Sequence, residues 1–287
     1  MLKGCLKKLL LVLIIPTVFT KAQIYNPKDI GICVEKFQLV VDKKLTKKPI
    51  GDVMVAIGNS FVGTKYEAHT LEVAQPEKLV VNLRGFDCTT YVESCLALAR
   101  AAKMKHPTVK KFMEQLQLIR YRGGKINGYP SRLHYFTDWI YDGQKKGIVR
   151  DITKSLGGIP YKKKIDFMTT HRSAYKQLKN EQFYKKMGEI EKELKKRKLY
   201  YIPEDSVAKI ENKLKDGDIV AFTTSIPGLD VSHVAMVIKM NNGETRILEA
   251  PDVGLRVKLS YVPLSEYVLN NKKQTGIIVA RPLEPKR

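Results

Sequence analysis

The stretch that decides the fold is "GFDCTTYVESCLALARAAK", residues 85–103. Small and apolar side chains recur in it at helical spacing, at Val92, Cys95, Leu96, Ala99 and Ala102. This spacing predicts a helix over residues 88–103 with one face in a core. The residue that needs an explanation is Cys88, which precedes these apolar positions.

Cys88 lies at or just before the start of this helix under either of two capping arrangements. Asp87 can act as the N-cap, or Thr90 can pair with Glu93, three residues later, as a capping box. In both cases the positive end of the helix dipole favours a thiolate at Cys88, the reactive form of a cysteine. We therefore interpret Cys88 as a candidate nucleophile; the competing interpretation is a small buried apolar residue.

The N-terminus has the pattern of a secretory signal peptide. Lys3, Lys7 and Lys8 precede an apolar run over residues 9–15, and small residues follow at Thr20 and Ala22. We predict a signal peptide over residues 1–22, too short to be a good membrane span, and no membrane span in the rest. The protein is expected to be exported, to the periplasm or the extracellular space, with residues 23–287 as a single catalytic domain.

Three cysteines follow residue 22, namely Cys33, Cys88 and Cys95, and three do not make a disulfide framework. Cys88 and Cys95 are two helical turns apart, roughly 10 Å, which is too far to bridge. A Cys33–Cys95 disulfide remains open in an oxidising compartment. Cys88 is then a candidate free thiol, which is unusual outside the cytoplasm for a residue without a chemical role.

The formal net charge is +22, from 51 Lys and Arg against 29 Asp and Glu. Basic proteins often bind nucleic acid, but an exported protein meets anionic polymers of the cell envelope instead. We expect no nucleic-acid partner, and a monomer; a merely solubilising charge is the alternative.

Helical patterns fill the first part of the chain and strand patterns the last part. Helices are predicted within residues 30–60, 88–103, 106–121, 131–147 and 174–198, and strands over 219–224, 232–240, 245–250, 254–262 and 275–283. This order predicts an α+β fold, in which the helix of residues 88–103 packs on a largely antiparallel sheet.

His233 has the best position for a general base. Alternation along residues 232–240 places His233, Ala235 and Val237 on one face of a strand. At the start of that strand, facing the cysteine-bearing helix, the imidazole would accept the thiol proton.

The loop between the strands of residues 232–240 and 245–250 decides which acid orients His233. A two-residue loop sets Asp252 opposite His233. A three-residue loop, with Gly243 in the left-handed position, pairs Ala235 with Glu249 and places Glu249 on the His233 face. We favour Glu249, because such loops end on glycine, and keep Asp252 in reserve.

Several motifs resemble those of the NlpC-type cell-wall cysteine peptidases, a papain-like superfamily, in their usual order. They are "GTKY" (63–66), "DCTTYVE" (87–93), "DGDIVAF" (216–222) and "SHVAMVI" (232–238). More narrowly, "NLRGFDCTTYVESCLALAR" (82–100), "SRLHYFTDWIYD" (131–142) and "ITKSLGG" (152–158) resemble the family labelled N-acetylmuramoyl-L-alanine amidase-like. The resemblance spans roughly residues 55–282.

The resemblance implies a papain-like NlpC-type core with a large helical insertion, about 104–214, that shapes substrate choice. It also implies a cysteine hydrolase that cleaves an amide bond in peptidoglycan stem peptides, either muramoyl–alanine or γ-D-glutamyl–diamino acid. Cys88 would attack the carbonyl, His233 would carry the proton to the leaving amine, and the Cys88 N–H would help hold the oxyanion. The sequence departs from the superfamily at its third residue, usually His, Asn or Gln, which is Glu249 here.

Further residues are expected to contact the substrate. Tyr66, matched to a motif tyrosine, would line the cleft beside Cys88 together with Asp87. Arg132, His134 and Tyr135 would contact substrate carboxylates or sugar; packing is the alternative for all three, and for Tyr66. No metal or cofactor is expected, because no histidine and carboxylate cluster has ligand spacing.

Two other functions remain open, one that needs the same catalytic residues and one that needs neither of them. A papain-like thiol acyl hydrolase or transferase, acting on lipids or small amides, would also need Cys88 and His233. A non-catalytic wall-binding module would need neither. A glycosidase is disfavoured, because no pair of acids stands out as its acid and nucleophile.

Overall fold

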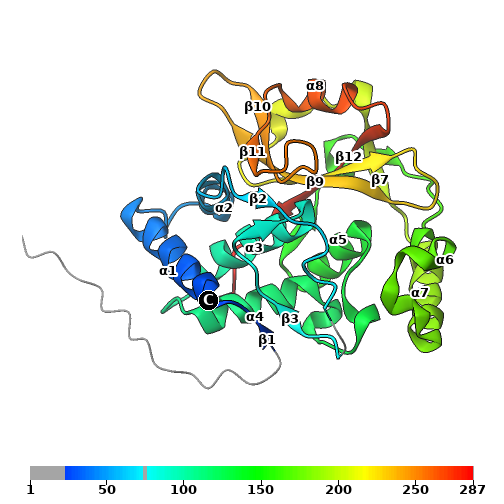
Figure 1. The fold of residues 1–287 in the computed structure, drawn as a ribbon. Helices are drawn as coiled ribbons and strands as arrows, with labels where there is room; N and C mark the ends of the chain where they lie inside the picture. The colour runs from blue at the N-terminus through cyan, green and yellow to red at the C-terminus, as the bar shows by residue number, and fades with distance from the viewer. Residues whose placement is uncertain (1–22, 74–75, 287) are drawn as a thin grey trace, which may run out of the picture.

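A computed structural model describes residues 23–73 and 76–286, so the predicted signal peptide lies outside the described residues (Figure 1). The fold is α+β, as predicted: a large antiparallel sheet with helices packed on it. Within the described residues, no helix is both long and apolar enough to cross a bilayer.

The sheet is antiparallel at every pairing and has the strand order β11-β10-β9-β8-β12-β7-β6, with β5 also paired to β12. Its strands are β5 (Val149–Asp151), β6 (Ile159–Pro160), β7 (Tyr200–Pro203), β8 (Ile219–Thr224), β9 (Val231–Lys239), β10 (Thr245–Glu249), β11 (Lys258–Leu259) and β12 (Gln274–Pro282). Two small parallel pairs lie outside it: β1 (Gln23–Ile24) with β3 (Leu79–Val80), and β2 (Lys65–Tyr66) with β4 (Gly85–Phe86).

Each face of the sheet carries its own hydrophobic core. One face is covered by α1 (Pro27–Asp42), α2 (Ile50–Asn59), α3 (Cys88–Ala102), α4 (Val109–Arg120) and α5 (Phe136–Lys145), which pack on side chains such as Val234 and Met236. The opposite face packs on α8 (Leu264–Leu269) through residues such as Ala235 and Val237. Figure 1 shows these two layers, with α6 (Phe167–Thr170) and α7 (Glu181–Leu194) to one side.

Helix α3 is the centre of the larger core and begins where the sequence predicts. Asp87 is its N-cap: the Asp87 carboxylate accepts from the Thr90 N–H at 2.7 Å, and the Thr90 hydroxyl accepts from the Asp87 N–H at 2.9 Å. Glu93, the other capping candidate, instead forms a buried ion pair with Arg120 at 2.6 Å. Removing either partner of such a pair costs about 3–5 kcal/mol, so this pair ties α3 to α4.

The β9–β10 hairpin has the three-residue loop that the sequence favours. Lys239 pairs with Thr245, and the Gly243 N–H donates to the Met240 carbonyl at 3.0 Å. Gly243 has a φ of +87°, the left-handed conformation that such a loop requires at its last position. Leu248 consequently pairs with Met236, which confirms the predicted register.

Three helices are shorter than predicted. Helix α4 begins after its cap Thr108, so residues 106 and 107 of the predicted helix over 106–121 precede it. Helix α5 starts only at Phe136, so the residues from 131 to 135 precede it. Helix α7 begins after its cap Asn180, whose side chain takes the N–H groups of the first turn and competes with continued helix toward residue 174.

The predicted helical insertion also contributes strands. Its segment of about 104–214 holds α4 to α7, but β5, β6 and β7 lie within it and join the main sheet. The predicted strand over 254–262 is reduced to the two residues of β11. Exposed loop residues and a left-handed Leu255, with a φ of +53°, interrupt its first half.

Cys33 and Cys95 are both free and fully buried, so the disulfide left open by the sequence is not formed in this structure. Burial raises the pKa of both thiols, because the low-dielectric core disfavours a thiolate. Cys88 is the third free cysteine, and it alone of the three is partly exposed.

Candidate active site

Cys88 is the first residue of α3 and lies at the end of the helix rather than along its side. The first N–H groups of a helix have no partner within it, and together with the dipole they attract negative charge. The Asp87 cap takes the N–H of Thr90, two residues further on. The Cys88 amide thus belongs to the set of helix-start donors that can serve a bound anion or oxyanion.

His233 on β9 and Glu249 on β10 are in direct contact. The His233 Nε2 lies 2.9 Å from the Glu249 Oε2, and the Glu249 side chain is only 1% exposed against 13% for His233. The hairpin register causes this contact, because it places Glu249 on the same face as His233. That face carries Ala235 and Val237 and packs on α8, so His233 does not lie, as the sequence had led us to expect, on the face that packs on α3. The imidazole also stacks on Phe222 of β8, with ring centroids 5.6 Å apart, which fixes the plane of the ring.

His233 completes the arrangement by interacting with Cys88. Because Nε2 is engaged by Glu249, the Nδ1 atom is the one left for the thiol. Burial alone would lower the pKa of His233, but the hydrogen bonds and negative charges of Cys88 and Glu249 outweigh it and raise the pKa to about 10. The site therefore favours an imidazolium beside the sulfur at neutral pH.

Tyr267 is a residue of the site that sequence reasoning missed. It comes from α8, and its hydroxyl donates to the Glu249 Oε2 at 2.7 Å, so one carboxylate oxygen holds both His233 and Tyr267. Burial raises the Tyr267 pKa, and the adjacent Glu249 charge raises it further, so the hydroxyl stays a donor. The other oxygen, Oε1, lies 3.8 Å from the Lys258 Nζ.

Tyr66 lies beside Cys88, as predicted from its motif. Its strand β2 pairs with β4, where Tyr66 is opposite Phe86, two residues before Cys88. Burial, followed by the negative charges of Cys88, Asp87 and Asp252, raises the pKa of Tyr66 to about 12. The hydroxyl therefore remains protonated and can donate a hydrogen bond.

Asp252, the reserve candidate for the third position, is an exposed loop residue. The negative charge of Asp252 contributes to the raised pKa values of Tyr66 and Tyr267, so Asp252 lies near the rim of the site. Glu249, by contrast, makes the buried contact with His233.

Packing accounts for the other three residues that the sequence assigned to substrate. Arg132 is 6% exposed and is paired with Glu72 at 2.9 Å and with Glu77 at 3.3 Å. The His134 ring contacts the Tyr129 carbonyl at 3.0 Å. The hydroxyl of the buried Tyr135 is used by Glu191 at 2.7 Å and by the Met168 N–H at 2.8 Å. The structure does not bring these side chains into the arrangement around Cys88.

The pKa values of His233 and His134 are shifted from the ordinary histidine value in opposite directions. We expect histidine NMR to show His233 still protonated at pH 8, because Cys88 and Glu249 hold its proton. His134 should stay neutral down to about pH 3, because burial, and then the Arg132 charge, lower its pKa to about 3. Cys88→Ala should lower the His233 midpoint and leave His134 unchanged. A His233 midpoint near 6.5 in the unmodified protein would contradict the arrangement.

The fold and site define an α+β protein with a cysteine, a histidine and a carboxylate joined across a helix start and a hairpin. A family model described as N-acetylmuramoyl-L-alanine amidase-like matches residues 56–277, and the chain belongs to this family. None of the curated proteins matches this chain.

Solved structures share the fold over most of the chain. A crystal structure of an N-acetylmuramoyl-L-alanine amidase from Bacteroides uniformis is 38% identical, with a TM-score of 0.77, and the match covers 82% of this chain and 99% of the other. A Bacteroides fragilis protein provisionally named a xylanase is 39% identical, with a TM-score of 0.73, over 78% of this chain and 98% of the other. A Legionella pneumophila protein, 23% identical with a TM-score of 0.65 over 91% of this chain and 98% of its own, is similar in fold alone.

Proposed function

We propose that this protein is an exported cysteine amidase that hydrolyses an amide bond in the stem peptides of peptidoglycan. The observation that carries the proposal is the arrangement of Cys88 at a helix start beside His233, which is in turn bonded to Glu249. A nucleophile, a base and a group that orients the base are the parts that nucleophilic catalysis requires. Membership of the amidase-like family supports the reaction class.

The reaction begins with attack of the Cys88 sulfur on the carbonyl carbon of the amide. The negative charge that develops on the carbonyl oxygen is held by the Cys88 N–H at the helix start. His233 donates its Nδ1 proton to the leaving nitrogen, the C–N bond breaks, and a thioester remains on Cys88. His233 then takes a proton from water, whose oxygen attacks the thioester and releases a carboxylic acid and the restored cysteine.

Glu249 acts on this reaction through His233. As a buried carboxylate at 2.9 Å it fixes the ring orientation and stabilises the imidazolium, a stronger effect than a neutral amide or imidazole would have. The hydrogen bond from Tyr267 holds Glu249 in that position. Glu249 and Tyr267 are therefore positioning residues, while Tyr66 contacts the substrate from beside Cys88.

The proposed superfamily, domain extent and cellular location follow from the same site. A cysteine at a helix start and a histidine on the neighbouring antiparallel sheet fit an NlpC-type, papain-like core. Residues 23–287 would form one catalytic domain, and the insertion of about 104–214 would shape substrate choice. Peptidoglycan lies outside the cytoplasmic membrane, which agrees with the signal peptide proposed for residues 1–22.

Digestion of defined muropeptides, with products identified by mass, tests the proposal. Cleavage of the muramoyl–alanine bond releases an intact stem peptide, whereas cleavage after γ-D-glutamate leaves a dipeptide on the sugar. We expect one of these products, and none with a Cys88→Ala variant. Acyl esters serve as one control, because a thiol acyl hydrolase would use the same Cys88, and xylan serves as another, because a protein of similar structure is provisionally named a xylanase. Turnover of either control with no muropeptide product would refute the proposal.

A further inference from the structure

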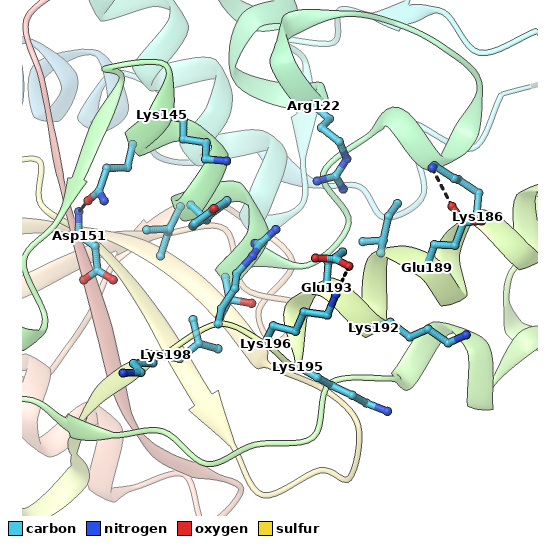
Figure 2. Close-up of a pocket in the computed structure, with 17 residues that line it drawn as sticks. Arg122, Lys145, Asp151, Lys186, Glu189, Lys192, Glu193, Lys195, Lys196 and Lys198 are labelled. Atoms are coloured by element: carbon cyan, nitrogen blue, oxygen red, sulfur yellow. Dashed lines mark hydrogen bonds and ion pairs between the residues drawn. The ribbon is translucent and has the colours of Figure 1, made fainter.

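A basic hollow of about 1280 Å³ lies on the insertion, between α5, α7 and the segment that follows α7 (Figure 2). Eight of its lining residues are basic and three are acidic. Figure 2 shows Arg122 and Lys145 on one side of the hollow and the lysines of α7 and of the segment after it on the other, with Lys192 and Lys195 extending outward into solvent. None of its lining residues belongs to the arrangement around Cys88.

Much of this positive charge is not neutralised by the protein. Among the described residues, two lysines of the hollow pair with neighbouring glutamates, Lys186 with Glu189 and Lys196 with Glu193. Four others are exposed and form no ion pair within the described part of the chain: Lys145, Lys192, Lys195 and Lys198. Like charges gathered in a concave site raise its positive potential and favour an anionic ligand.

Arg122 and Arg197, two arginines of the hollow, are both held in place by the buried Asp138. The Asp138 carboxylate, 1% exposed, binds Arg122 at 2.5 Å through one oxygen and Arg197 at 2.7 Å through the other. Arg197 also lies over the Tyr141 ring, 3.8 Å from its centroid. Each guanidinium has five N–H donors, so both keep donors for a ligand after binding Asp138. A solvated helix end explains the lysines among residues 195–198. It does not explain why Arg122, from a distant segment, shares the buried Asp138 carboxylate with Arg197.

The hollow is linked to the catalytic strand by a short path. Thr137, next to Asp138, donates its N–H to the buried Asp230 carboxylate at 2.8 Å. Asp230 directly precedes β9, and His233 follows three residues later, roughly 10 Å along a strand. This path joins the hollow to the catalytic strand through the protein interior, and a ligand that offers one group to the hollow and another to Cys88 must carry repeated anionic groups, as a polymer does.

We propose that the basic hollow binds carboxylates of neighbouring stem peptides on a peptidoglycan strand whose scissile bond lies at Cys88. This rests on the proposed function and adds a second contact to it. Planar guanidinium groups held in a fixed orientation suit carboxylates, which they bind in bidentate fashion. Two linked contacts raise the affinity for the polymer above that for either group alone.

The test measures binding to purified peptidoglycan sacculi by pelleting, with Cys88→Ala in every protein so that no hydrolysis occurs. The hollow variant changes Lys145, Lys192, Lys195 and Lys198 to glutamine. The matched control changes four exposed lysines elsewhere, Lys185, Lys209, Lys213 and Lys272, to glutamine. We expect the hollow variant to bind at least about tenfold more weakly, or about 1.4 kcal/mol, and the control to bind within about twofold of the parent.

A second arm identifies the anion. Sacculi whose carboxylates have been amidated should bind the parent as weakly as untreated sacculi bind the hollow variant. Equal binding by the hollow and control variants, or unchanged binding to amidated sacculi, overturns the proposal. With Cys88 intact, the hollow variant should hydrolyse a single-stem muropeptide at the normal rate, and that assay reports on the proposed function separately.

Discussion

Replacing Cys88 with alanine should lower the turnover of a defined muropeptide by about 10⁴- to 10⁶-fold, the loss typical of removing a catalytic nucleophile. The reason is that the Cys88 sulfur, at the start of α3, is the group that interacts with His233. The half-buried thiol is small, so the fold should survive, and circular dichroism and thermal unfolding would check this. Cys95→Ala is the matched control, because that thiol is fully buried in the same helix.

The outcome separates the enzyme from a wall-binding module. A module would bind peptidoglycan equally well with and without Cys88 and would have no turnover to lose. Activity of Cys88→Ala within tenfold of the parent would remove Cys88 from the mechanism altogether.

Glu249→Ala should lower turnover by about 10²- to 10⁴-fold, by analogy with the aspartate of serine-protease triads, which is the reference case for this role. Without the carboxylate, His233 loses both its orienting partner and the charge that stabilises its imidazolium. Glu249→Gln keeps the size and one acceptor and should retain much more activity than Glu249→Ala. Asp252→Asn should be mild, because Asp252 is exposed at the rim.

Steady-state kinetics on one muropeptide compare these three variants directly. A dead Asp252→Asn alongside an active Glu249→Ala would reverse the assignment of the third residue. Tyr267→Phe adds a readout that is specific to positioning. It should shift the His233 titration seen by NMR, because the carboxylate loses the hydrogen bond that holds it.

Local patterns were sufficient to predict the central parts of the site. Helical spacing located α3, and the capping residues near its start located its first residue Cys88, because both signals lie within the helix and its cap. Strand alternation and a glycine in a hairpin loop located His233 and Glu249 on one face, because loop length sets register.

The features that the sequence did not predict depend on contacts between segments that are distant in the chain. Tyr267 reaches Glu249 from a short helix with weak local signals, and only the packing of α8 on the sheet brings them together. The strands β5 and β7 exist because β12 offers an unpaired edge, which no pattern within the insertion reveals. The basic hollow likewise joins residues from segments far apart in the chain, and its sequence signal is limited to the lysine run near residue 195.

The β9–β10 loop also constrains how this sequence can diverge. It is exposed and touches nothing in the site, so single substitutions at Asn241 or Asn242 should be tolerated. An insertion or deletion of one residue there is a different event. It would shift the pairing by one residue and turn Glu249 to the other face, and its place next to the imidazole would be taken by Leu248 after an insertion or by Ala250 after a deletion. Homologues that keep this site should therefore conserve the length of a loop whose residues they are free to vary.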